Sequence, residues 1–375
     1  MKKVQTVTCS GDLPNLATND LRILLRVREE DGLTEIGMRL HDVEMREFRK
    51  LVAPFQAQMR SLRDTGTKWR RSGSLEDIVR RGHLKLVQEA LEMADDVTMP
   101  VQSWDDYEEI TAVGDLFYKA EWNGISVDAS VPGLTSYFTS TFSKHVIDNR
   151  IYPQIDVIPK DRTGRMGIRG GYNVMSWPHG CRHALVAGTG KVLGAIDVVA
   201  MDVTSLMVLN KDFRAAVGDT DDHYAAMASA VFGSQSNESA RKIVKSCFLP
   251  MTYGASNDVV AETLNCSLST VVMLRQAFSP LLNMLPIGPD LARLVQETSS
   301  MAFRAGLAGL APFTDKFKAL FPIHDELVLE VNQDSATDDI VNVAELIEQG
   351  AMKRTGVRYK TKQKFGKNYG EMNEI

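Results

Sequence analysis

Two short apolar segments, far apart in the chain, each carry an aspartate at the point where the apolar pattern ends or turns. The first covers residues 192–196 and leads into Asp197, and the second alternates around the tripeptide His324-Asp325-Glu326. Both segments have the length of a strand, and the second has the pattern of a hairpin with a polar tip. A carboxylate at the end of a buried strand is costly unless it is paired or bound to a metal. Any fold of this chain must therefore accommodate both acids.

The two aspartates allow two interpretations. A hairpin tip in solvent would explain Asp325 without any function, and a single acid after a strand is weak evidence of a site. Two strand-borne aspartates brought side by side would instead bind two hard divalent cations, which prefer oxygen ligands. A third acid, Asp202, follows Asp197 by five residues. From these residues alone, both interpretations stay open.

The composition excludes several classes of protein. The chain has 375 residues, a length typical of one large or two to three ordinary domains, and its 44% hydrophobic content is enough to form a buried core. Its net charge is -5. No apolar run approaches the roughly 18 residues of a membrane span, and the N-terminus lacks the pattern of a signal peptide. Its 4 cysteines have no C-x-x-C spacing, which argues against a disulfide scaffold or structural zinc site. We expect a cytoplasmic protein that makes no contact with a membrane.

Local basic clusters are the place to look for an anionic partner, because the overall charge is acidic. The segment KWRRSGSLEDIVRRGHLK, residues 68–85, lies in a highly charged helical pattern. It could grip a nucleic-acid backbone, or it could be the solvated face of a surface helix. Further along, Arg241, Lys245, Leu249 and Tyr253 recur every four residues and would share one helix face. Its two cations could hold a triphosphate, although an ordinary exposed helix face has the same pattern.

Taken in order, these segments resemble the polymerase module of family A DNA polymerases, in a minimal phage- or plasmid-like form. The resemblance runs from about residue 134 to the C-terminus. DVVAMD is similar to motif A, with Asp197 as metal ligand and Asp202 as the sugar gate. Residues 241–254 are similar to motif B, and residues 323–326 to motif C. NKD, at residues 210–212, and DHYAAMASAVFG, at residues 222–233, follow the family's order between motifs A and B.

Weaker matches also fall in the family's order. RIYPQIDVIPKDRTGRMG resembles the strand pair that leads into the T-G-R element, LVQETSSMAFRAG resembles the family's Q-G-T-A-A segment, and FGKNYGEM resembles its C-terminus. The resemblance implies contacts to primer-template DNA, and the residues expected to make them are Arg165, Asn173, Gln296, His324 and Glu326.

The resemblance also implies a reaction, in which a primer 3′-hydroxyl is extended with dNTPs. Two Mg²⁺ ions, for which Mn²⁺ could substitute, would be held by Asp197 and Asp325, and Lys245 would act with them in catalysis. The residues expected to bind the nucleotide are Arg241, Lys245, Leu249, Tyr253, Asp202 and Tyr224.

The expected fold is α+β, a right-hand polymerase with an antiparallel palm sheet, helical fingers and an N-terminal helical region. The expected divisions are a charged helical region at 1–115, a reduced thumb-like segment at 116–150, palm at 151–221 and 291–375, and fingers at 222–290. The upstream chain is short for a proofreading exonuclease domain, so we expect no proofreading.

Several departures from the family's pattern keep alternatives open. Leu249 stands where an aromatic residue is usual, Tyr224 stands where a histidine is frequent, and Asp202 is one methylene shorter than the usual glutamate. RKIVK also resembles motif B of single-subunit phage-type RNA polymerases. One alternative is therefore a primer-independent or ribonucleotide-incorporating polymerase. Another is a replication accessory that binds nucleic acid with a decayed active site. The N-terminal region could also dock a replication helicase or primase.

Overall fold

The computed structural model describes residues 109, 112–114, 116–117, 120, 124–128, 130, 146, 149–151, 153–156, 165–170, 173–177 and 179–375. The basic cluster at residues 68–85 lies outside the described residues. Most of the predicted N-terminal region and thumb-like segment lies outside them too, so the predictions for these parts stay predictions.

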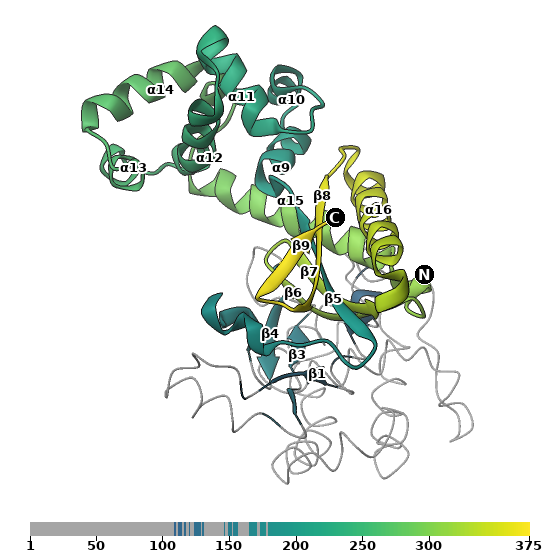
Figure 1. The fold of residues 1–375 in the computed structure, drawn as a ribbon. Coiled ribbons are helices and arrows are strands. Elements are labelled where there is room, and N and C mark those ends of the chain that lie inside the picture. Colours follow the sequence, from purple (N-terminus) through teal and green to yellow (C-terminus); the bar gives the residue numbers. More distant parts are fainter. Residues whose placement is uncertain are drawn as a thin grey trace, which may run out of the picture.

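An antiparallel sheet of five strands, in the order β6-β7-β5-β8-β9, carries the two aspartates (Figure 1). The central strand β5 pairs with β7 on one side and with β8 on the other, so both of its edges are hydrogen-bonded to neighbouring strands. Two small antiparallel pairs, β1-β2 and β3-β4, lie before this sheet in the chain. The strands are β1 (Ile125–Ser126), β2 (Arg150–Ile151), β3 (Gln154–Asp156), β4 (Gly167–Gly170), β5 (Lys191–Val198), β6 (Phe317–Ile323), β7 (Glu326–Asn332), β8 (Thr361–Asn368) and β9 (Glu371–Glu374).

Helices occupy the chain between β5 and β6, and polar N-caps separate the short ones. Asn210, Asp222 and Asn237 each accept a hydrogen bond from a backbone N–H in the first turn of the helix that follows, and Ser256 and Ser267 do the same. The helices of the described chain from residue 179 onward are α9 (Met201–Leu209), α10 (Lys211–Val217), α11 (His223–Phe232), α12 (Glu238–Thr252), α13 (Asn257–Leu264), α14 (Leu268–Leu282), α15 (Pro289–Ala308) and α16 (Ala336–Thr355). Short 3-10 helices are η2 (Val174–Ser176), η3 (His179–Ala184), η4 (Gly233–Gln235), η5 (Ala311–Phe313) and η6 (Gln333–Ser335).

Two hydrophobic cores divide the described residues, and α15 joins them. Leu291 and Val295, near the start of α15, belong to the core of the helical group, whereas Ala302, Phe303 and Leu307 belong to the core under the sheet. Figure 1 shows α15 running from the group α10–α14 to the sheet. Together with α9, whose Met201 belongs to the core under the sheet and whose Leu206 belongs to the helical core, this helix fixes how the helical group stands relative to the strands.

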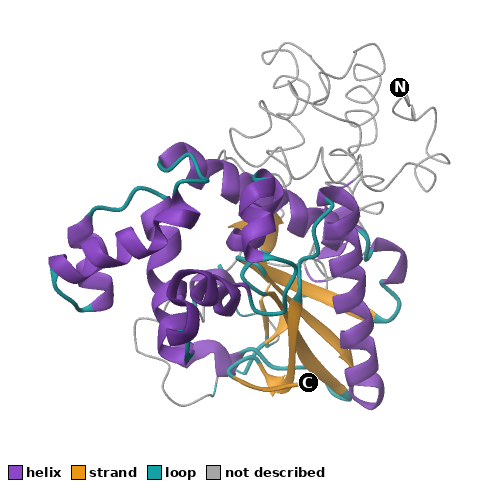
Figure 2. Ribbon diagram, turned by 90° about the horizontal axis from the view of Figure 1, so that it is seen from above, coloured by secondary structure: helices purple, strands orange, loops and turns teal. Residues whose placement is uncertain are grey.

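Glycines allow the close packing of α15 against α16 and of α16 against β5. A Cβ at Gly306 would lie 2.8 Å from the carbonyl oxygen of Ile347, and one at Gly350 would lie 2.6 Å from that of Ala305. A Cβ at Gly194, in the middle of β5, would lie 2.8 Å from Ile340 Cδ1. The sheet and the two helices thus form one tightly packed unit, in which helices lie beside the strands (Figure 2).

The fold confirms the coarse expectation of an α+β structure with an antiparallel sheet. The model is a mixed α+β structure with an antiparallel sheet, and the strand, the hairpin and the long helical stretch occur where the pattern predicted them. The sequence predicts the division between palm and fingers at residue 222. In the structure Val203, Leu206 and Met207 of α9 already pack into the helical core. As folding domains, the predicted boundaries stay a prediction. Among the described residues, no helix is long and apolar enough to cross a membrane.

Candidate active site

The register of β5 and β7 brings the two strand-borne aspartates to the same end of the sheet. Asp197 is the direct partner of Glu326, and Val198 N donates a hydrogen bond to Asp325 O at 3.0 Å. Asp325 stands in the two-residue turn between β6 and β7. Its neighbour His324 has φ 55°, in the left-handed region that tight hairpin turns require. The pairing of two strands, remote in sequence, therefore places the two acids side by side.

Burial and mutual repulsion destabilise the ionised form of these acids. Burial, followed by the charges of Asp325 and Glu326, raises the pKa of Asp197 to about 6, although Lys364 and Lys362 oppose the shift. Burial also raises the pKa of Asp325. Both acids are half-buried, and no side chain in the described chain donates a hydrogen bond to either carboxylate, although a backbone hydrogen bond opposes the rise in the pKa of Asp325.

The donor set suits a hard divalent cation, because it consists of carboxylate oxygens that repel each other. The described residues contain no group of three or more acids, histidines or cysteines placed to hold a metal by themselves. Any cation here would thus take its remaining ligands from substrate or water, as catalytic sites with open positions do.

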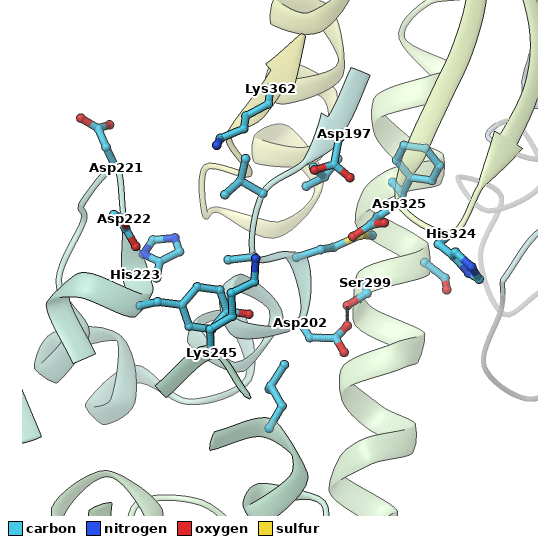
Figure 3. A pocket seen from close by; sticks show the side chains of 18 of the residues that line it. Asp197, Asp202, Asp221, Asp222, His223, Lys245, Ser299, His324, Asp325 and Lys362 are labelled. Atoms are coloured by element: carbon cyan, nitrogen blue, oxygen red, sulfur yellow. Dashed lines mark hydrogen bonds between the residues drawn. The ribbon is translucent and has the colours of Figure 1, made fainter. Parts of the chain in front are cut away.

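A cavity of about 440 Å³ opens beside the two acids, in the size range of small-molecule sites. Its lining comes from the sheet end, from the first turns of α9 and α11, from α12 and from the middle of α15. Figure 3 shows Asp197 and Asp325 on one side of this space and His223 with Asp222 on the opposite side. The cavity therefore separates the two aspartates at the end of the sheet from the first turn of α11, which faces them across it (Figure 3).

Cations from α12 form part of that facing wall. Arg241 and Lys245 both line the cavity, one turn apart on the same helix. Arg241 Nε donates to Asp222 Oδ2 at 2.5 Å, which orients the guanidinium. Lys245 forms no ion pair within the described chain, so its amine is available to an anionic ligand. Leu249, one turn further along, also lines the cavity.

Asp202 lines the cavity, and both of its carboxylate oxygens accept hydrogen bonds. Tyr253 Oη donates to Oδ2 and Ser299 Oγ donates to Oδ1, each at 2.9 Å. Ala200, with φ 49°, turns the chain between β5 and α9, which puts Asp202 in the first helical turn. Three elements, α9, α12 and α15, thus meet at one carboxylate.

A chain of buried hydroxyls continues behind this carboxylate. Ser299 Oγ lies 2.8 Å from Ser205 Oγ, which lies 2.9 Å from Tyr359 Oη. Each hydroxyl has one proton to donate, and Ser299 gives its proton to Asp202. Ser205 must therefore donate to Ser299, and Tyr359 to Ser205. Burial raises the pKa of Tyr359 to about 12, which keeps it protonated as the first donor of the chain.

The first turn of α11 contributes two ring side chains. Tyr224 lines the cavity, and burial together with the charges of Asp202 and Asp325 raises its pKa to about 12. His223 is only 6% exposed, and its Nδ1 has no hydrogen-bond partner in the described chain. Burial lowers the pKa of His223, and the charge of Lys360 adds to that effect. His223 is thus a neutral group at neutral pH.

The residues expected to contact DNA do not all lie in the cavity. Arg165 and His324 line it, and Gln296 lies on α15 one turn before Ser299 without lining it. Asn173 caps the short helix η2, where its side chain accepts a hydrogen bond from Met175 N. Glu326 accepts a hydrogen bond from Tyr369 Oη at 2.5 Å and does not line the cavity. The last two side chains thus have structural partners in the protein.

Sequence reasoning missed several residues at this site. His223 and Asp222 are adjacent in sequence to Tyr224, which is expected to bind the nucleotide, and Ser299 is three positions after Gln296, which is expected to contact DNA. Their closeness in sequence to Tyr224 and Gln296 is the feature that could have identified them. Lys362, Ser205 and Tyr359 carried no signal, because each reaches the site only through strand pairing or helix packing.

Comparisons with known proteins show no family for this chain. No protein-family model matches the chain, and no curated protein sequence matches it either. Among the solved structures that match is the "POL domain of Pol1 from M. smegmatis complex with DNA primer-template and dNTP", with a TM-score of 0.47 and 14% identity. The match covers 96% of this chain and 66% of that chain, so this chain spans just under two thirds of its length.

Proposed function

We propose that this protein is a template-directed DNA polymerase, which extends a primer 3′-hydroxyl with dNTPs. The observation that supports it most is one cavity with two strand-end aspartates on one side and Arg241 and Lys245 on the other. A nucleoside triphosphate needs both kinds of group, because its phosphates are anionic and its transfer requires divalent cations. The order of the family A motifs in the sequence agrees with this arrangement.

The proposed reaction is a phosphoryl displacement. The primer 3′-oxygen forms a bond to the α-phosphorus, the bond between that phosphorus and the bridging oxygen breaks, and pyrophosphate leaves with the electron pair. The hydroxyl proton is released to solvent. Two Mg²⁺ ions, when bound at Asp197 and Asp325, would favour ionisation of the attacking hydroxyl and neutralise charge on the phosphate oxygens.

The protein's own residues position the reactants. Lys245 holds the triphosphate as a point charge, and Arg241 holds it as a planar fork that Asp222 orients. Asp202 lies against the sugar, where its fixed carboxylate would meet a ribose 2′-hydroxyl. Tyr253 and Leu249 lie along the same helix face and support the nascent base pair.

A primer-extension assay tests this function. The full chain is incubated with a labelled primer on a template of defined sequence, with dNTPs or NTPs and with Mg²⁺ or Mn²⁺ in turn. We expect products whose length follows the template in dNTPs, and none with Asp325→Asn. Extension that ignores the template, or no extension with any metal, would refute the proposal. Products only with NTPs would favour the ribonucleotide alternative.

A further inference from the structure

Lys362 lines the cavity and has no role in the reaction proposed above. It lies on β8, directly opposite Asp197 in the strand pairing, and it lines the same cavity as Lys245. Figure 3 shows its side chain leaving the strand on the side where Asp221 and His223 lie, away from Asp325. The site therefore receives positive charge from two elements on different walls, helix α12 and strand β8.

The neighbouring acids form no ion pair with the Lys362 amine in the described chain. Asp221, which lines the same cavity, pairs with Lys360, and Asp222 pairs with Arg241. The charge of Lys362 lowers the pKa of Asp197, its partner in the strand register, but the two side chains form no ion pair. Among the described cavity residues, Lys245 and Lys362 are thus amines without a carboxylate partner, facing a space wide enough for a phosphate chain.

We infer that Lys362 and Lys245 together hold the phosphate chain of the incoming nucleotide, and the pyrophosphate product after it, between β8 and α12. This inference rests on the proposed function and extends it, because β8 becomes part of the nucleotide site. An ammonium group is a compact point charge that binds phosphate oxygens without demanding one orientation. Two such groups on opposite walls could hold the anion both before and after its bond to the α-phosphorus breaks.

Lys364 provides a matched control on the same strand. It lies two residues further along β8, so it projects from the same face of the sheet, and its charge acts on Asp197 more strongly than that of Lys362. It does not line the cavity. A general electrostatic effect on the acids would therefore appear in Lys364 variants at least as clearly, whereas direct contact with phosphate would appear only in Lys362 variants.

The test is a calorimetric titration of inorganic tripolyphosphate, at matched free Mg²⁺, into the full-length wild type and three variants. Lys362→Met should raise the Kd about 10-fold, Lys362→Arg should largely restore it, and Lys364→Met should change it less than about 2-fold. Equal weakening by both methionine variants, or no binding by the wild type, would overturn the inference. Thermal melts check that the exposed Lys362 position tolerates methionine.

Two further measurements separate this inference from the proposed function. If Lys362→Met weakened primer-template binding more than tripolyphosphate binding, the ligand would be a nucleic-acid phosphate and the inference would be wrong. If the wild type extended primers but its tripolyphosphate affinity did not depend on Lys362, the function would stand without the inference. If the wild type bound tripolyphosphate through Lys362 but extended nothing, the anion subsite would stand and the polymerase proposal would fail.

Discussion

Ser299 Oγ donates a hydrogen bond to Asp202 Oδ1 at 2.9 Å, so a residue of α15 holds the acid that α9 presents to the cavity. Tyr253 holds the other carboxylate oxygen. Asp202 is shorter than the glutamate that family A motifs carry at this place, and two hydroxyl donors restrict where its carboxylate can lie. In the proposed reaction this restraint determines how well a ribose is rejected.

The first prediction is that Ser299→Ala relaxes the choice of sugar. Loss of one hydroxyl donor frees the carboxylate of Asp202 and should lower the ratio of kcat/KM for dNTP over NTP about 3- to 10-fold. Asp202→Ala should lower the ratio further, and Asp202→Glu should raise it. Ser300→Ala, on the next residue of α15, removes a hydroxyl that has no hydrogen bond to Asp202, and it should keep the wild-type ratio. An unchanged ratio in Ser299→Ala and Asp202→Ala would show that Asp202 does not select the sugar.

The second prediction is that Asp197→Asn abolishes primer extension and raises the free energy of unfolding. The raised pKa of Asp197, about 6, means that its ionised form is disfavoured in the folded state. The cost begins as pH rises above the unfolded value of 3.8 and is complete above about 6. At pH 7 without divalent cations, Asn should therefore raise the free energy of unfolding by about 1 to 2 kcal/mol, after allowance for partial exposure.

Denaturant unfolding at two pH values and in Mg²⁺ checks this prediction. The gain in stability should disappear only below about pH 3, well under the unfolded pKa of 3.8, where the wild-type carboxyl is protonated in both states. Mg²⁺ should stabilise the wild type and have little effect on the variant, and primer extension by the variant should be abolished. Appreciable synthesis by Asp197→Asn at saturating Mg²⁺ would contradict its role as a metal ligand.

The third prediction concerns Lys245. Lys245→Ala should lower kcat/KM for dNTP about 100-fold, because a charged contact to the triphosphate is lost, while the Kd for primer-template changes less than about 2-fold. Lys242→Ala is the control, since Lys242 lies on the same helix, is exposed and does not line the cavity. Steady-state kinetics and fluorescence anisotropy provide the two readouts. Equal losses in nucleotide use and in duplex binding would show that this helix face binds the duplex.

The fourth prediction concerns a lysine outside the active site. Lys318 of β6 is largely buried, its Nζ donates to Gly124 O at 2.7 Å, and burial lowers its pKa to about 8 from 10.5. Between these pH values the unfolded chain binds the proton more tightly than the folded chain, so rising pH increases the free energy of unfolding. Relative to Lys318→Met, the wild type should gain up to about 3 kcal/mol between pH 8 and 10.5. A constant difference between the two proteins over that range would refute the shifted pKa.

Local patterns in the sequence predicted much of what the structure contains. The apolar runs before Asp197 and around Asp325 predicted β5 and the β6-β7 hairpin, because side-chain periodicity and a polar two-residue turn are local properties. The spacing of four between Arg241, Lys245 and Leu249 predicted one helix face for the same reason, and all three line the cavity. The roles of these residues, and the N-terminal region, stay predictions.

Only the tertiary structure decided which of these groups meet, because that depends on strand register and on the packing of helices remote in sequence. Lys362 reaches the cavity because β8 pairs with β5 in a register that sets it opposite Asp197. Ser205, Ser299 and Tyr359 form one hydroxyl chain because α9, α15 and the segment before β8 pack together and bury them. The structure also gives protein partners to two residues that the family resemblance assigned to DNA. The side chain of Asn173 caps η2, and that of Glu326 accepts a hydrogen bond from Tyr369, while their contact with DNA stays a prediction. A linear pattern determines what a segment can form locally, whereas its partners are determined by which buried groups satisfy one another across the fold.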